Sequence, residues 1–157
     1  DSKVHLNRKK DLAERIIPLL LPDMTAKPRR RDIDETAFNS ITDESAYWIG
    51  YMFARSYIGR RIGGQISIEV RVIFKDRNYL RRLKSFLKST HRIHGDSANS
   101  RFSFRSDAIA SALERYGIIH GKKNRRIIPS LIDNRNFRRG ILDANKRTRP
   151  LIAQLYK

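Results

Sequence analysis

Residues 46–54 read Ala46-Tyr47-Trp48-Ile49-Gly50-Tyr51-Met52-Phe53-Ala54, a run that is apolar on nearly every face of a helix. Such a run indicates a helix buried between other elements. Thr42 suits the N-cap, and the acidic pair Asp43 and Glu44 suits the positive end of the helix dipole. We therefore predict a helix over residues 42–58. Gly50 costs this helix about 1 kcal/mol in propensity, which is understandable if the backbone of another helix comes very close.

The sequence that follows this helix predicts a small antiparallel sheet. After a turn at Gly63-Gly64, apolar and polar residues alternate over 66–72, which is typical of a half-buried strand. From residue 42 the order is helix, strands, helix, strands, helix and a further helix, which indicates an α+β fold. The other predicted elements are a helix at 80–87, strands at 91–94 and 101–105, a helix from Ser106 or Asp107 to Gly117, and a helix at 135–145.

The charge of the chain points to a polyanionic partner. The chain holds 34 Lys and Arg against 16 Asp and Glu, a formal net charge of +18. Arg outnumbers Lys by 23 to 11, and its planar guanidinium matches phosphate and guanine edges. DNA and RNA fit equally well, because each phosphate neutralised releases a condensed counterion. A membrane surface fits less well, since we find no basic amphipathic helix with an unbroken apolar face.

Other features exclude whole classes of protein. A hydrophobic content of 39% can build a core, so the chain is not a disordered tail. The absence of cysteine excludes disulfides and thiolate metal sites. His91 and His94 have no third ligand nearby in the sequence, so we predict no metal site and no other cofactor. The longest apolar run, residues 16–21, is too short to cross a membrane and contains Pro18.

Two nine-residue stretches resemble the motif of the LAGLIDADG homing endonuclease family. Residues 48–56 fit the first copy of that motif, and residues 138–146 fit the second. The elements between the copies follow the family order, so the resemblance covers about residues 36–147. It implies a lobe of order αββαββα with a curved antiparallel sheet, plus a basic N-terminal arm. It also implies that Gly50 and Gly140 allow the two motif helices to pack face to face.

The resemblance also divides the chain. We expect a basic N-terminal arm and linker at 1–35, the LAGLIDADG-like lobe at 36–134, and the second motif helix with a C-terminal tail at 135–157. Only twelve residues follow Asn145, so we expect one complete lobe and the opening of a second. The surface left bare by a missing lobe is expected to be apolar. A homodimer partner or a larger ribonucleoprotein is then expected to cover it.

Both catalytic acids that the resemblance implies are replaced. The metal-binding acid of the motif becomes Arg55 in the first copy and Asn145 in the second. Mg²⁺ prefers anionic oxygen ligands, whereas a guanidinium is cationic and has no acceptor atom. Asp143 lies about 200° around the helix from Asn145, so it does not substitute. We predict no catalytic residue and no bound metal; instead Arg55, Asn145 and Lys146 would contact phosphates directly.

Members of the family read DNA with the outer face of a saddle-shaped sheet. Here the resemblance places alternate residues of two strands on that face, and arginine and serine side chains suit bases or phosphates. Basic residues of the arm, the loops and the helix ends join them. The predicted nucleic-acid-binding residues are Arg29, Arg30, Arg31, Arg55, Arg60, Arg61, Ser67, Glu69, Arg71, Arg101, Ser103, Arg105, Lys122, Lys123, Arg125, Arg126 and Lys146.

Three functions are compatible with the sequence. The first is a non-catalytic nucleic-acid-binding protein derived from a LAGLIDADG homing endonuclease, contacting phosphates and grooves through a basic sheet face. The second is an RNA-binding structural component of a ribonucleoprotein, such as a splicing helper or an organellar ribosome protein. The third is an active DNA endonuclease with unorthodox ligands or a partner subunit. We expect an intracellular location, in a mitochondrion, a plastid, or bacterial or phage-infected cytoplasm.

Overall fold

The structure is a computed structural model that describes residues 31–60, 63–119 and 129–145. The chain divides into two compact units, residues 1–30 and residues 31–157, and all described residues belong to the second. The predicted arm at 1–35 therefore lies outside the described residues except for its last part, 31–35. The elements of the second unit are α2 (Asp43–Arg55), β1 (Ser56–Arg60), β2 (Ile66–Ile73), the 3-10 turn η1 (Phe74–Asp76), α3 (Arg77–Phe86), β3 (Ile93–Gly95), β4 (Asn99–Phe104), α4 (Asp107–Arg115), α5 (Pro129–Ile132) and α6 (Arg135–Ala144).

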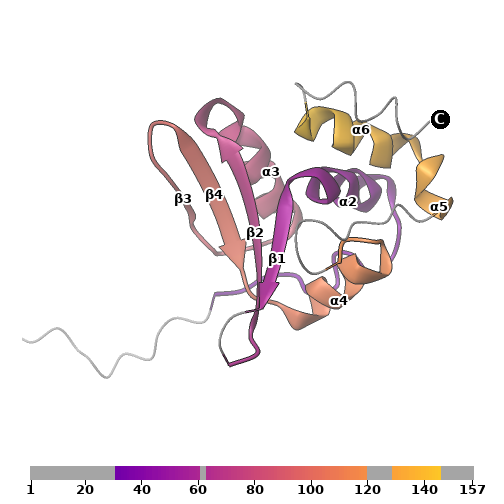
Figure 1. The fold of residues 1–157 in the computed structure, drawn as a ribbon, viewed down its shortest axis with the longest axis horizontal. Coiled ribbons are helices and arrows are strands. Elements are labelled where there is room, and N and C mark those ends of the chain that lie inside the picture. The colour runs from indigo at the N-terminus through magenta and orange to yellow at the C-terminus, as the bar shows by residue number, and fades with distance from the viewer. Residues whose placement is uncertain (1–30, 61–62, 120–128, 146–157) are drawn as a thin grey trace, which may run out of the picture. The chain divides into compact units, whose positions relative to one another are not determined.

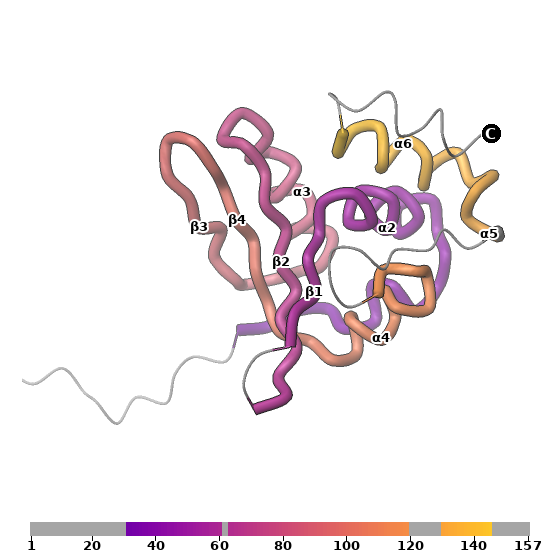
Figure 2. The backbone as a smooth tube through the Cα atoms, in the orientation of Figure 1, coloured from indigo at the N-terminus to yellow at the C-terminus, as the bar shows by residue number. Residues whose placement is uncertain are grey.

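The four strands form one antiparallel sheet in the order β1-β2-β4-β3. Helices α2, α3 and α4 lie on one side of this sheet, and α6 lies along α2 (Figure 1). Figure 2 follows the chain through the two hairpins, β1–β2 and β3–β4. The α+β prediction and the order αββαββα are confirmed. The short helix α5 was not predicted; it begins at Pro129, a residue that favours the first position of a helix.

Helix α2 begins as predicted and ends earlier than predicted. Thr42 is the N-cap: its hydroxyl accepts a hydrogen bond from the Ser45 amide at 3.1 Å, and the Ser45 side chain accepts one from the Thr42 amide at 2.7 Å. The helix stops at Arg55, so the prediction that 56–58 is helical was wrong. Ser56 turns into extended backbone while its hydroxyl donates to the carbonyl of Met52 at 2.6 Å. Strand pairing with β2 then takes over.

The β3–β4 hairpin is displaced slightly from its predicted bounds. Strand β3 covers Ile93–Gly95 instead of 91–94, and β4 begins at Asn99, two residues early. The Asp96 carboxylate accepts hydrogen bonds from the amides of Asn99 and Ala98, both at 2.8 Å. These bonds tighten the turn and hold the pKa of Asp96 below its ordinary value. Strand β4 therefore begins at the end of this turn, and the sequence pattern did not indicate this earlier start.

One face of the sheet is buried and the other is open. Along β2 and β4 the apolar residues Ile68, Val70, Phe102 and Phe104 are at most 2% exposed. They pack with the aromatic side of α2, where Trp48 is also almost completely buried, in one core. The polar residues that alternate with them lie on the other face. The buried face fixes the register of the open one, because a one-residue slip would exchange the two.

Residues 31–35 form backbone hydrogen bonds with the segment that follows α3. The Asp34 amide donates to the carbonyl of Leu87 at 2.8 Å, and the Thr90 amide donates to the carbonyl of Asp32 at 3.0 Å. Beside this contact His91 is half-buried, its ring meeting the ring of Phe104 edge-on at 6.2 Å between centroids. Burial of the imidazole lowers the pKa of His91 below its ordinary value of 6.5.

We expect the lowered pKa of His91 to make the protein less stable in mild acid. The unfolded chain binds a proton near pH 6.5, whereas the folded chain binds it only at lower pH. The stabilisation by neutral His91 is therefore complete above about pH 6.5 and is lost as the pH falls below it. Urea unfolding at pH 7.5, 6.5 and 5.5 should show this decline in the wild type and a smaller one in His91→Gln. Equal declines in the two proteins would contradict the assignment to His91.

Candidate nucleic-acid interface

Helices α2 and α6 approach each other through two glycines. A Cβ atom on Gly50 would overlap the carbonyl oxygen of Phe137 and would lie 2.9 Å from its carbonyl carbon. A Cβ atom on Gly140 would overlap the carbonyl oxygen of Tyr47 and would lie 2.7 Å from the amide nitrogen of Tyr51. Each glycine therefore contacts the backbone of the opposite helix. This is the position in which only glycine fits, and the two helices lie side by side in Figure 1.

A polar contact joins the same two helices. The Tyr47 hydroxyl donates to Oδ2 of Asp143 at 2.8 Å. Burial of the ring, followed by this hydrogen bond, raises the pKa of Tyr47 above its ordinary value. The tyrosine therefore remains a neutral donor at physiological pH. Asp143 thus fastens α6 to α2 and is turned toward Tyr47 in the first half of α2.

The C-terminal ends of α2 and α6 come together, and an arginine joins them. Arg55, the last residue of α2, donates from Nε to the carbonyl oxygen of Ala144, the last residue of α6, at 2.7 Å. Asn145 follows as the C-cap of α6, and its amide donates to the carbonyl of Ile141 at 3.0 Å. Both helix ends carry the negative pole of a helix dipole, which a cation stabilises. The guanidinium therefore supplies positive charge and a donor to these ends.

The residues at these helix ends do not fit a divalent metal ion. Arg55 brings a cation and donors, and Asn145 brings an uncharged amide. Mg²⁺ requires oxygen ligands, usually including one or two carboxylates. Within the described ranges, no three His, Asp or Glu side chains gather in a way that could hold a metal ion. The polar contact at this place is the hydrogen bond that the Arg55 guanidinium donates to the carbonyl of Ala144.

We expect Arg55→Ala to lower the free energy of unfolding by about 1–2 kcal/mol. The substitution removes a charge-assisted hydrogen bond and a cation at a helix C-terminus. Urea denaturation followed by circular dichroism measures the change. Arg81→Ala, on the exposed side of α3, is the matched control and should change stability by less than about 0.5 kcal/mol. Equal effects of the two substitutions would exclude the capping role.

The outward side of α6 is charged, contrary to the expected apolar surface. Its apolar residues Phe137 and Ile141 are at most 7% exposed because they turn toward α2. Arg135 and Arg139 are exposed, together with Leu142 at 47%. Among the described residues of this helix, Leu142 is therefore an isolated exposed apolar side chain. The prediction of an apolar face here was wrong because α2 already covers the apolar side.

The open face of the sheet gathers the strand residues that the sequence placed there. Glu69 of β2 lies opposite Ser103 of β4, and Arg71 lies opposite Arg101. Ser67 precedes them on the same face of β2 by alternation. Arg105, just after β4, donates from Nη1 to Oε1 of Gln65 at 2.6 Å. The structure thus brings arginine and serine side chains from two neighbouring strands onto one surface.

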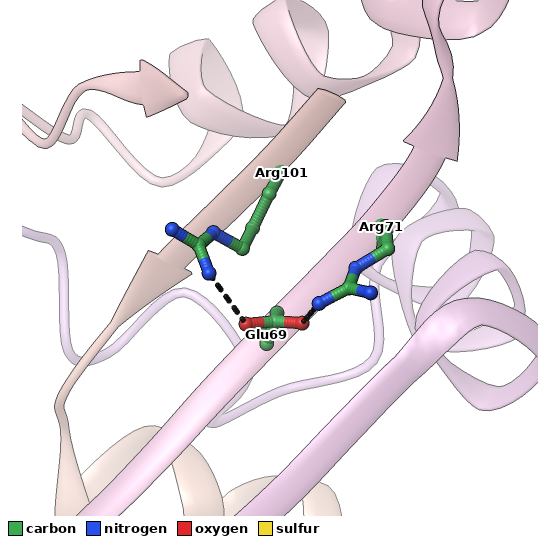
Figure 3. Close-up of polar contacts among 3 residues, drawn as sticks. All are labelled: Glu69, Arg71 and Arg101. Atoms are coloured by element: carbon green, nitrogen blue, oxygen red, sulfur yellow. Dashed lines mark hydrogen bonds and ion pairs between the residues drawn. The ribbon is translucent and has the colours of Figure 1, made fainter. Parts of the chain in front are cut away.

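Glu69 lies between the two opposed arginines (Figure 3). Arg71 donates from Nη2 to Oε1 of Glu69 at 2.9 Å, and Nη1 of Arg101 lies 3.9 Å from Oε2. The side chain of Glu69 is 25% exposed, against 62% for Arg71 and 49% for Arg101. The carboxylate is therefore the inner member of the group and the guanidinium groups are the outer ones. A phosphate approaching this face meets the arginines first.

The remaining predicted contacts are dispersed or undescribed. Arg60 lies opposite Ile66, in register with the helix-covered face and not with Glu69. Arg31 is exposed at the start of the described chain, and Arg55 lies at the helix ends. The others lie outside the described residues: Arg29, Arg30, Arg61, Lys122, Lys123, Arg125, Arg126 and Lys146.

Two residues of the open face were not predicted to belong to it. Tyr57 of β1 lies opposite Glu69 and is 42% exposed. His94 of β3 lies opposite Arg101 and is exposed. Only the pairing register places them beside the arginines. The sequence offered one signal for Tyr57, its position directly after the helix motif, but no alternation marked β1 as a strand.

Comparison with known proteins gives a partial likeness. No family model and no curated protein matches the chain. The solved structures that it resembles include the LAGLIDADG meganuclease I-CpaMI, the LAGLIDADG homing endonuclease I-GzeII and the meganuclease I-SmaMI. Meganuclease I-CpaMI bound to uncleaved DNA aligns with a TM-score of 0.37 and 19% identity, over 49% of this chain and 30% of that chain. I-GzeII in complex with its DNA target aligns with a TM-score of 0.36 and 16% identity, over 49% of this chain and 30% of that chain. I-SmaMI bound to uncleavable DNA aligns with a TM-score of 0.36 and 18% identity, over 47% of this chain and 30% of that chain.

This chain therefore spans about 30% of the length of these structures. In the part of the chain that the structure describes, no helix is long and apolar enough to cross a membrane.

Proposed function

We propose that this chain is a non-catalytic nucleic-acid-binding protein derived from a LAGLIDADG homing endonuclease. The observation that carries the binding proposal is the open sheet face. Arg71 and Arg101 stand on it in register, and Arg105 follows at the end of β4. The one carboxylate among them, Glu69, is already paired. In a chain of net charge +18 this surface suits the phosphates and base edges of a nucleic acid.

The absence of catalysis is proposed from the helix ends. Hydrolysis of a phosphodiester by metal ions requires ligands that hold the ions against the attacking and leaving oxygens. Arg55 brings a cation to this place, and its Nε donates a hydrogen bond to the carbonyl of Ala144 at the end of α6. Asn145 adds no charge. We therefore expect this site to position the sugar–phosphate backbone of the nucleic acid by hydrogen bonds and not to cleave it.

Derivation from a homing endonuclease is proposed from the motif copies. Gly50 and Gly140 stand at the same place in the two copies and meet at one helix crossing. The elements between them run in the order that the family resemblance implies. A homodimer or a larger assembly and an intracellular location also belong to the proposal; a partner of α6 would meet its charged outward side and not an apolar surface.

Binding and cleavage assays together test the proposed function. We expect the full chain to bind mixed-sequence duplex DNA with a log–log salt slope of about −0.9 for each phosphate contacted. Incubation of supercoiled plasmid with the protein and Mg²⁺ should leave the plasmid uncut. Specific nicking that is lost in Asn145→Ala would overturn the non-catalytic assignment. A salt-independent affinity would overturn the binding assignment.

A structured RNA at matched salt provides the second arm of the binding assay. The A-form major groove is too deep and narrow for side chains to read, so RNA duplexes are recognised by shape and backbone. We expect tighter binding to duplex DNA, since the open sheet face offers side chains that can reach base edges. Tighter binding to the RNA would favour a ribonucleoprotein component instead.

A further inference from the structure

The open face contains a pairing that is unfavourable on its own. Arg71 on β2 and Arg101 on β4 are direct cross-strand partners. Side chains in such positions have Cβ atoms about 5 Å apart, and like charges directly opposite each other destabilise a sheet. Two adjacent free guanidinium groups would also repel each other into separate rotamers. Something on this face must oppose that repulsion if the two arginines are to act together.

Glu69 is placed to do so. It precedes Arg71 by two residues on the same face of β2, and it lies diagonally across from Arg101. Each carboxylate oxygen faces a different arginine, Oε1 at 2.9 Å from Arg71 and Oε2 at 3.9 Å from Arg101. Among the described strand residues of the open face, Glu69 is the single carboxylate. The three side chains together carry a charge of +1.

We propose that Glu69 is a positioning residue for this face: it holds Arg71 and Arg101 as an oriented pair and limits their pairing with arbitrary backbone phosphates. This inference rests on the proposed function and adds a source of selectivity to it. Each guanidinium has five N–H donors. Glu69 accepts a hydrogen bond from one donor of Arg71 and attracts Arg101 by charge at 3.9 Å, so most donors of both arginines stay available. A ligand must then match the orientation of the pair or displace the carboxylate.

Two consequences follow from this arrangement. Glu69 repels phosphate and competes for both arginines, so it lowers affinity for nucleic acid in general. It also keeps the guanidinium planes in place before binding, which reduces the ordering cost for a ligand that fits them. Removal of its charge should therefore raise indiscriminate binding while it loosens the arginines. A residue that contacted the nucleic acid directly would have the opposite effect on affinity.

The test compares Glu69→Gln with Glu114→Gln on mixed-sequence duplex DNA. Both variants change net charge equally, but Glu114 is exposed on α4, among the helices that cover the other face. We expect Glu69→Gln to bind about three- to ten-fold more tightly in low salt, with a salt slope steeper by about 0.9 for each additional phosphate that is neutralised. Glu114→Gln should keep the wild-type slope. Glu69→Asp, which retains the charge, should restore most of the wild-type behaviour.

A second measurement uses the free protein. Nitrogen-detected NMR of the arginine guanidinium groups should show slowed rotation for Arg71 and Arg101 in the wild type and faster rotation in Glu69→Gln. Weaker binding by Glu69→Gln, a response equal to that of Glu114→Gln, or unchanged guanidinium rotation would each overturn the proposal. Wild-type protein that fails to bind DNA while its arginines remain ordered would instead overturn the proposed function and leave the positioning role intact.

Discussion

We expect Gly140→Ala to lower the free energy of unfolding by about 3 kcal/mol, because the helix crossing leaves no space for the new methyl group. Its Cβ would overlap the carbonyl oxygen of Tyr47 and press on the amide of Tyr51. Both are backbone atoms in the interior of α2, so no rotamer change relieves the overlap. The helices must separate, and Phe137 and Ile141 then lose part of their packing against α2. A native domain has only about 5–15 kcal/mol of stability to lose.

Gly64→Ala is the matched control for this substitution. Gly64 has a φ of +81°, and nothing lies within 4 Å of the place that a Cβ would take. It should cost about 1 kcal/mol, from backbone conformation alone. Urea unfolding followed by circular dichroism compares the two variants with the wild type. Similar losses in both would show that the glycine at the helix crossing is replaceable and that α2 and α6 are not closely packed.

Gly50 and the buried face could be predicted because local patterns indicate them, whereas Gly140 was predicted only from the family resemblance. An apolar run with a glycine at its centre favours the close approach of another backbone at that glycine. The alternation of Phe102 and Phe104 with Arg101 and Ser103 likewise fixes two faces of a strand from sequence alone. Both predictions depend on residues within a few positions of each other, so each describes the geometry of a single helix or strand.

The contacts of Arg55 with Ala144 and of Glu69 with Arg101 could not be predicted, because each joins two different elements. The carbonyl that Arg55 caps belongs to Ala144, 89 residues along the chain. The opposition of Arg71 and Arg101 depends on the register between β2 and β4, which the hairpin lengths and the core set together. Strand β1 was missed as well, since its burial pattern does not alternate cleanly and Gly59 interrupts it.

Arg71→Ala combined with Arg101→Ala should weaken binding to duplex DNA by roughly one to two orders of magnitude near physiological salt. The double variant removes two guanidinium groups and leaves Glu69 behind, so the charge of the three side chains changes from +1 to −1. The decrease in affinity should therefore exceed that expected for two phosphate contacts alone. The salt slope should become shallower by about 0.9 for each phosphate that the variant no longer neutralises.

A charge-matched control separates the role of this face from the effect of net charge. Arg81→Ala combined with Arg115→Ala removes the same charge from exposed positions on α3 and α4. Long-range attraction falls off over about 10 Å at 0.1 M salt, so this control should weaken binding only slightly and keep most of the slope. Fluorescence anisotropy over a salt series gives both quantities for each protein. If the two double variants lose affinity equally, the chain binds as a diffuse cation and the open sheet face is not its nucleic-acid-binding surface.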